Sequence, residues 1–140
     1  MKDLHNTINV KRAISPVSVS DNTAQVSQII DRAGAEAVEF IIATGSLADA
    51  DATFAVLLEE SEASDMTGAA AVADSNLIGT EALAGFQFDD DNEVRKLGYK
   101  GTMRYLRLTI TPTGNASAAV LCAVAVLSGL AVGPSANPPA

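Results

Sequence analysis

The sequence has little of what catalytic and metal-binding sites are made from. Its 140 residues include one histidine, His5, one cysteine, Cys122, and no tryptophan. A single cysteine excludes an intrachain disulfide, and one cysteine with one histidine excludes an ordinary zinc site. His5 lies in a polar N-terminal segment, with no sign of a third group that would orient it for catalysis. No glycine motif of a phosphate-binding loop is present. We therefore expect no enzymatic activity, no catalytic residues, no metal and no cofactor.

Long apolar runs and basic clusters are also missing. The most apolar stretch, Ala118–Leu127, is about half of the ~20 residues that a membrane-spanning helix needs. Met1–Val10 is too polar for a signal peptide. Between Ala33 and Val94 the chain carries fourteen acidic residues and no Lys or Arg, and its net charge is −8. Such a stretch repels the phosphates of nucleic acids. We expect a soluble protein made in a cytoplasm, with neither nucleic acid nor membrane as a partner.

What is present is an aliphatic protein of one-domain size. Apolar residues make up 48% of the chain and aromatic residues only 4%, so Ala, Val, Leu and Ile must form the core. Cys122 lies within the run Ala118–Leu127, which is apolar at successive positions, and we expect it to be a buried structural thiol. A strand that is apolar on both faces should lie centrally in a sheet or be covered by a partner.

Alternation of apolar and other residues predicts β-strands through most of the chain. It is clearest at 106–111, where Leu106, Leu108 and Ile110 alternate with Arg107, Thr109 and Thr111. The expected strands are Ile8–Ile14, Gln25–Asp31, 38–43, 54–58, Gly85–Phe88, Val94–Tyr99, 106–111 and Val120–Leu127. About eight strands separated by turn residues predict an all-β sandwich or barrel.

The segments between the predicted strands and the two ends of the chain lack this alternation. We expect turns at Thr44–Ser46 and at Asp89–Asn92, the second closing a hairpin between its flanking strands. For the segment Ser64–Leu77 we predict a loop that contains one helical turn, with Ser64 or Asp65 as its N-cap. The predicted single domain, 1–140, has an N-terminal arm at 1–7, a core at 8–127 and a Gly/Pro-rich tail at 128–140.

Without catalytic groups, function is expected to lie on surfaces. The basic segment from Arg95 to Arg107 combines Tyr, Met and Arg, which are enriched in protein interfaces. The interface candidates are Arg95, Lys96, Tyr99, Lys100, Met103, Arg104 and Arg107. The acidic cluster Asp89–Glu93 leaves open a weak cation site, although a solvated turn is the simpler interpretation. Paired carboxylates such as Asp49 and Asp51 leave open a hydrolase.

Several stretches of the sequence resemble the capsid cement, or decoration, proteins of tailed bacteriophages. The resemblance covers most of the chain up to about Leu127. It rests on Met1–Asn6, Arg12–Val17, Asp21–Thr23, Glu39–Phe54, Leu77–Ala84 and Arg104–Pro112.

The resemblance implies a jelly-roll β-sandwich with extended arms, bound to the outer capsid surface of the virion. There it would bridge neighbouring major capsid proteins, with self-association as a homodimer. We expect the acidic segment to face solvent or basic capsid patches, and Arg95–Arg107 to contact acidic capsid residues. The alternative is a carbohydrate-binding β-sandwich of a phage fibre or surface protein, although such sites usually carry more aromatic residues than this chain has.

Overall fold

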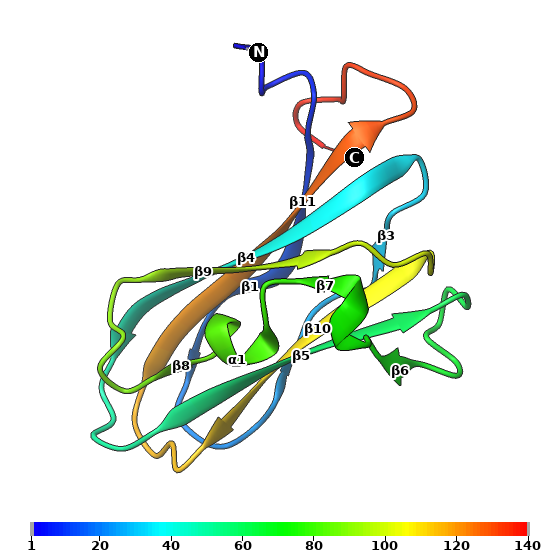
Figure 1. The fold of residues 1–140 in the computed structure, drawn as a ribbon. Coiled ribbons are helices and arrows are strands. Elements are labelled where there is room, and N and C mark those ends of the chain that lie inside the picture. Colours follow the sequence, from blue (N-terminus) through cyan, green and yellow to red (C-terminus); the bar gives the residue numbers. More distant parts are fainter. Residues whose placement is uncertain (1, 140) are drawn as a thin grey trace.

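A computed structural model describes residues 2–139 and consists of two antiparallel β-sheets packed face to face (Figure 1). One sheet has the strand order β1-β11-β4-β9-β7. The other has the order β2-β10-β5-β6, with β3 also pairing with β10 and β8 with β5. The strands are β1 (Asn9–Val19), β2 (Gln25–Val26), β3 (Ile30–Asp31), β4 (Ala35–Leu47), β5 (Thr53–Ser61), β6 (Ala70–Ala71), β7 (Leu77–Ile78), β8 (Phe86–Gln87), β9 (Val94–Tyr99), β10 (Tyr105–Thr113) and β11 (Ala119–Leu130). The predicted all-β sandwich is confirmed.

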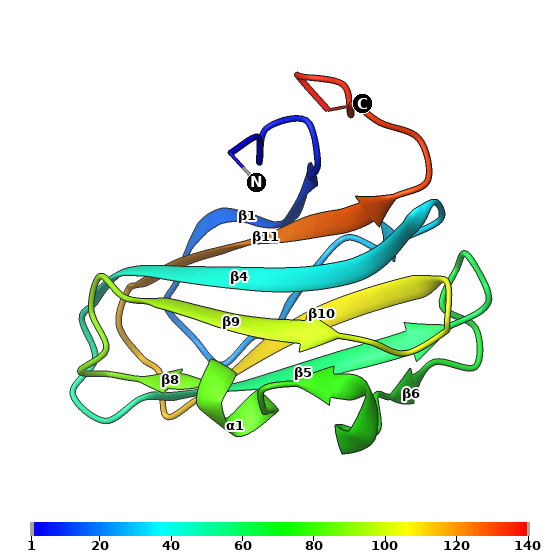
Figure 2. The same ribbon diagram turned by 45° about the horizontal axis from the view of Figure 1, so that its top comes forward.

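The strands pair in a nested order. β1 pairs with β11, β2 and β3 pair with β10, β4 pairs with β9, and β5 pairs with β8. The chain thus folds like one long antiparallel ribbon rolled upon itself, which is the arrangement of a jelly roll. The two sheets are formed because successive parts of the ribbon fall alternately in one sheet and the other (Figure 2).

The core lies between the sheets and follows the predicted alternation. Val38, Phe40 and Ile42 of β4 are buried, and so are the inward residues of β10. Side chains at alternate positions of a strand point to one face, so each long strand contributes one row to the core. Phe54 of β5 stacks on Phe86 of β8, with ring centroids 4.7 Å apart.

One predicted turn and one predicted hairpin are wrong. Thr44–Ser46 lies within β4, where Thr44 is buried and accepts the backbone N–H of Glu93 through Oγ1 at 2.9 Å. Asp89–Asn92 does not close a hairpin, because β8 pairs with β5 in one sheet while β9 pairs with β4 in the other. The turn therefore carries the chain across the sandwich. The same turn residues suit a hairpin and a connection between two sheets. Only the pairing partners of β8 and β9 show which of the two Asp89–Asn92 forms.

The segment Ser64–Leu77 is mostly loop, as predicted. Its helical turn, η1, runs from Asp74 to Asn76 rather than starting at Ser64 or Asp65. A second short helix, α1 (Glu81–Ala84), was not predicted, and Thr80 caps it by accepting the N–H of Leu83. No helix within residues 2–139 is long and apolar enough to cross a membrane.

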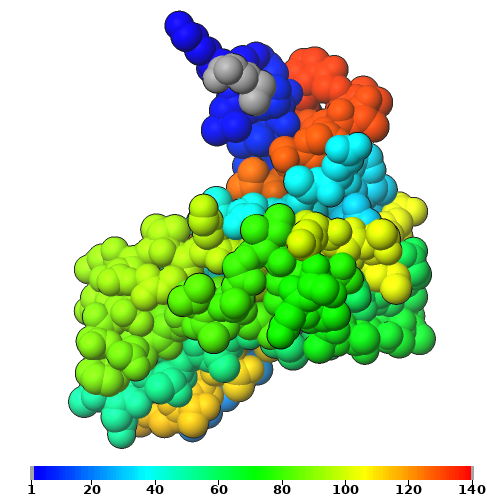
Figure 3. Space-filling view, in the orientation of Figure 1, coloured from blue at the N-terminus to red at the C-terminus, as the bar shows by residue number. Residues whose placement is uncertain are grey.

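The two ends of the chain leave the sandwich together (Figures 1 and 2). β11 continues to Leu130, three residues beyond the predicted end of the core at Leu127. The tail then lies beside the N-terminal arm, where Ser135 donates its hydroxyl to the carbonyl of Ile8. Both arms project from the sandwich as one feature (Figure 3).

A candidate protein-docking face

The outer side of the five-stranded sheet is unusually apolar. Register places Val10 opposite Val126, Ile41 opposite Val124 and Ala43 opposite Cys122, all on the side that faces away from the core. We call this surface the apolar face. It consists of Val10, Ile41, Ala43, Ile78, Val94, Val120, Cys122, Val124 and Val126.

Five side chains of the apolar face are exposed in the single chain, and the other four, Ile41, Ala43, Cys122 and Val126, are half-buried. Val94 is 65% exposed, Ile78 is 56% exposed, and Val10, Val120 and Val124 are each about 40% exposed. A contiguous exposed patch of large aliphatic residues marks an interaction site on a soluble protein.

The outer side of the other sheet has a different composition. β10 and β5 present mainly hydroxyls and an ion pair there, from Thr53, Glu59, Arg107, Thr109, Thr111 and Thr113. Its exposed large aliphatic residues include Leu57, Val26 and Ile29, which lies between β2 and β3. An antiparallel sheet with one solvated face is expected to alternate in this way. Only the five-stranded sheet departs from the pattern, so its outer side is the better candidate for docking.

Cys122 lies on the apolar face and is half-buried. The prediction of a buried structural thiol is therefore wrong. The alternation of β11 explains this, because Leu121 and Ala123 point into the core and the residue between them points outward. The sequence did carry a signal for the apolar face. The run Ala118–Leu127 is apolar at both even and odd positions, so both sides of this strand need to be covered.

Three charged side chains are placed on or beside the apolar face: Arg12, Glu39 and Lys96. Glu39 lies opposite Val126 on one side and Gly98 on the other. Its burial raises its pKa, and the nearby Lys96 opposes that rise. Among residues 2–139, neither Glu39 nor Lys96 belongs to an ion pair.

The predicted interface segment from Arg95 to Arg107 does not form a single patch. Lys96 is on the outer side of β9, whereas Arg107 is on the outer side of β10, in the opposite sheet. The two residues therefore face opposite sides of the sandwich. Of the other candidates, Lys100 and Arg104 are exposed and Met103 is half-buried.

Tyr99 is a core residue, only 1% exposed. Its hydroxyl donates to Glu60 Oε2 at 2.5 Å and accepts the backbone N–H of Met103 at 3.0 Å. Burial, and after it the hydrogen bond to Glu60, raises the pKa of Tyr99 to about 12. The ring thus fixes the connection between β9 and β10.

The three arginines among the candidates are paired within the chain. Arg95 contacts Asp90 and Glu93, Arg104 contacts Asp31, and Arg107 contacts Glu59. A contact with a capsid would have to compete with these pairs. Lys96 and Lys100 are the exposed cations of the segment that form no ion pair among residues 2–139.

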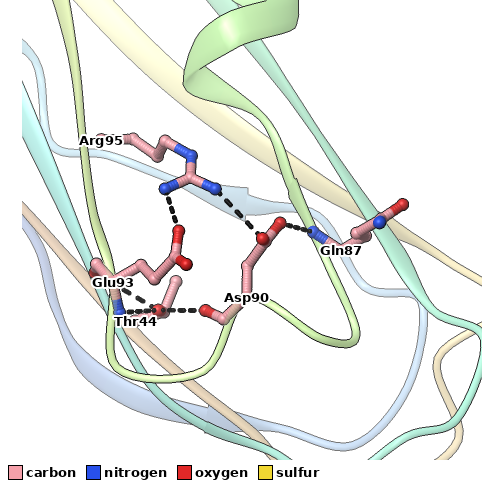
Figure 4. Close-up of polar contacts among 5 residues, drawn as sticks. All are labelled: Thr44, Gln87, Asp90, Glu93 and Arg95. Atoms are coloured by element: carbon pink, nitrogen blue, oxygen red, sulfur yellow. Dashed lines mark hydrogen bonds and ion pairs between the residues drawn. The ribbon is translucent and has the colours of Figure 1, made fainter.

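Figure 4 shows how the acidic turn is held. Asp90 accepts the backbone N–H of Gln87 at 2.8 Å and pairs with Arg95 at 3.2 Å. Thr44 Oγ1 donates to the carbonyl of Asp90 at 2.7 Å. Arg95 also contacts Glu93, as drawn. These contacts use the turn's carboxylates to join the two sheets, which favours a structural turn over a cation site.

The pair Asp49 and Asp51 is likewise engaged in local structure. Asp49 accepts backbone N–H groups of Asp51 at 3.0 Å and of Ala116 at 2.8 Å, and these bonds lower its pKa to about 2. Hydrogen bonding to Asp49, and after it the charge of Asp49, raises the pKa of Asp51. Within residues 2–139 no group of three or more His, Cys, Asp or Glu side chains is placed to hold a metal ion.

The bidentate pair of Arg104 and Asp31 gives a pH prediction. Two hydrogen bonds of 2.9 Å, the first cause of the shift, lower the pKa of Asp31 to about 2. A carboxyl group with a depressed folded-state pKa adds stability above its unfolded pKa, near 4, and this is lost as the pH falls toward 2. Because the Arg104 and Asp31 side chains are 50% and 38% exposed, solvent screens the pair and we expect the contribution to be small.

Replacement of Arg104 by leucine should therefore raise the pKa of Asp31 toward its ordinary value, as measured by NMR titration of the side-chain carboxyl group. The stability difference between the wild type and Arg104→Leu should shrink between pH 5 and pH 2, since Asp31 becomes protonated in both. An unchanged titration of Asp31 in the variant would contradict this assignment.

Comparison with known proteins does not assign the chain to a family. No protein-family model matches the chain, and no curated protein matches it significantly. Among solved structures, it is similar to the CBM22-1–GH10 modules of Clostridium thermocellum xylanase 10B, with 10% identity and a TM-score of 0.47 over 89% of this chain and 26% of that one. Dimeric latent PorU from Porphyromonas gingivalis has 11% identity and a TM-score of 0.43, over 89% of this chain and 12% of that one. The GH115 4-O-methyl-alpha-glucuronidase BtGH115A has 11% identity and a TM-score of 0.41, over 90% of this chain and 18% of that one. The chain thus spans about a quarter or less of each.

Proposed function

We propose that this chain is a capsid cement protein of a tailed phage, which binds the outer capsid surface as a homodimer and stabilises contacts between major capsid proteins. The observation that carries a docking role is the apolar face, exposed on one side of a sandwich whose other side is polar. The capsid as the place of action is supported by the resemblance of the sequence stretches described above.

A second copy is the occupant that best fits the apolar face. Two sheets can stack about 10 Å apart with their side chains interdigitating, as the two sheets within one sandwich do. Gly98 adds no side chain to the row that contains Val126 and Glu39, and this leaves room for the Glu39 side chain on that part of the face. The face also carries charges of both signs, Glu39 and Lys96, so it is complementary to itself under two-fold symmetry.

The rest of the surface suits the outside of a shell that contains DNA. The net charge is −8, and the internal pairs of Arg95, Arg104 and Arg107 neutralise three of the nine basic residues. An acidic surface is repelled by nucleic acid. The polar sheet and the two arms are left to contact the major capsid protein once the apolar face is covered.

Self-association can be tested by substituting two similarly exposed residues that lie on opposite sides of the sandwich. Val124 is 40% exposed on the apolar face, and Leu57 is 37% exposed on the polar sheet. Val124→Asp should convert a dimer into a monomer, because it would bury a charge without a partner. Leu57→Asp is the matched control and should remain dimeric. Sedimentation equilibrium measures both.

Cys122 provides an independent measurement on the unaltered chain. As the sole thiol, located on the apolar face, it should react with a bulky maleimide more slowly as protein concentration rises and the dimer forms. A wild-type chain that stays monomeric at high concentration, with labelling independent of concentration, would overturn the homodimer.

The capsid role needs its own experiment. The purified chain should co-sediment with assembled capsids of its phage made without it, and not with free capsid subunits. It should also raise the temperature at which those capsids break open, because a ligand that binds only the assembled lattice stabilises it by mass action. Absence of co-sedimentation, together with binding on a glycan array, would favour the carbohydrate-binding alternative.

A further inference from the structure

A hollow opens on the apolar face at the end nearest the arms. Its volume is about 420 Å³, and its lining includes Leu4 and Ile8 of the N-terminal segment, Val126 of β11 and Ile78 of β7. The one carboxylate that lines it belongs to Glu39. A hollow with aliphatic walls and one acidic group is suited to the side chain of a lysine, whose stem is apolar and whose end is charged.

The backbone of β9 makes room for the Glu39 carboxylate. A Cβ atom on Gly98 would lie 2.6 Å from Glu39 Oε2 and 2.9 Å from Ile78 Cβ. The Glu39 side chain therefore extends from β4 over Gly98 of β9 toward Ile78 of β7. There it is partly shielded from water. Burial raises its pKa, and Lys96 of the same chain opposes that rise only through its charge, because Glu39 forms no direct ion pair among residues 2–139. A partner cation would supply the missing compensation.

Lys96 is the cation available on the same face. It lies opposite Ile41 on β4, two residues before Gly98 on β9, so it is a diagonal neighbour of Glu39. It is exposed and forms no ion pair among residues 2–139. Arg12, by contrast, donates to Ser15 Oγ at 2.7 Å and to Gln28 Oε1 at 3.2 Å, so its guanidinium is already engaged.

We infer that Glu39 and Lys96 fix the register of the dimer, with Glu39 of each copy binding Lys96 of the other beside the hollow. This inference rests on the self-association proposed above. When two identical sheets stack face to face, the two-fold axis lies in the plane between them. An axis passing between Glu39 and Lys96, perpendicular to the line that joins them, brings each next to the opposite charge of the second copy. Both pairs then form at once.

The pairs act mainly on specificity. Valine rows slide past one another at small cost, since one aliphatic contact resembles the next. A half-buried carboxylate left opposite an aliphatic side chain is unfavourable, so registers that separate the charges are disfavoured. Glu39 and Lys96 are therefore positioning residues of the interface, while the valines supply most of the buried apolar area.

A charge exchange tests this inference. In Glu39→Lys, the homodimer would place the introduced lysine against Lys96 twice. In Lys96→Glu, it would place the introduced glutamate against Glu39 twice. We expect each variant alone to self-associate at least about tenfold more weakly than the wild type, because like charges in contact are costly. An equimolar mixture should recover association, since every cross-copy contact in the heterodimer is then between opposite charges.

The readout is sedimentation equilibrium of each variant and of the mixture, with one variant carrying an affinity tag so that the heterodimer can be isolated. Glu62→Lys, an exposed site in the loop after β5, is the matched control and should associate like the wild type. If the wild type dimerises but the mixture does not recover, the register is wrong and the homodimer stands. If the wild type is monomeric, the proposed self-association itself fails.

Discussion

Phe40→Ala is expected to lower the free energy of unfolding by about 3–5 kcal/mol, the range for truncating a buried aromatic residue. Phe40 is fully buried between the two sheets. Its neighbour in β4, Ile41, lies on the apolar face and is only half-buried. Ile41→Ala should cost no more than about 1 kcal/mol in the monomer, since it alters only an outward position of a strand.

The two substitutions should separate folding from docking. Urea-induced unfolding in dilute solution should be shifted strongly by Phe40→Ala and little by Ile41→Ala. Sedimentation equilibrium at high concentration should show the loss of self-association in Ile41→Ala. If Ile41→Ala associated as tightly as the wild type, the apolar face would not be the dimer interface.

Gly101→Ala is expected to destabilise the fold by about 2–4 kcal/mol, the combined cost of overpacking and of a lost hydrogen bond to a carboxylate. A Cβ at residue 101 would lie 2.4 Å from the hydroxyl oxygen of Tyr99 and 2.5 Å from its Cζ. The ring cannot move aside freely, because it is buried and its hydroxyl bonds both Glu60 and Met103.

A double-mutant cycle identifies the cause of this effect. In a Tyr99→Leu background the ring is gone, so Gly101→Ala should add less than about 0.5 kcal/mol to the destabilisation. Thermal or urea unfolding of the four proteins gives the coupling energy. Additive effects of the two substitutions would mean that the cost of Gly101→Ala does not arise at Tyr99.

The interface segment illustrates where sequence reasoning reached its limit. The pattern Lys96, Tyr99, Arg104 and Arg107 has the composition of an interface, and its residues are close together in the chain. In the fold β9 and β10 belong to different sheets, so Lys96 and Arg107 face opposite ways and Tyr99 is in the core. Composition identifies residue types that suit an interface, but only strand pairing decides which of them share a surface.

The sequence by itself determined the class of this protein, an aliphatic all-β sandwich, and placed its long strands nearly where they lie. It could do so because alternation with a period of two depends only on the order of residues. It also pointed to β11 as a strand that needs cover on both sides. Tertiary structure alone decided which sheet each strand joined and that Asp89–Asn92 crosses between sheets. It likewise decided that Val124, Ile41 and Cys122 form one exposed face with Glu39 beside Lys96. These features depend on register between strands distant in the chain, and no local pattern encodes it.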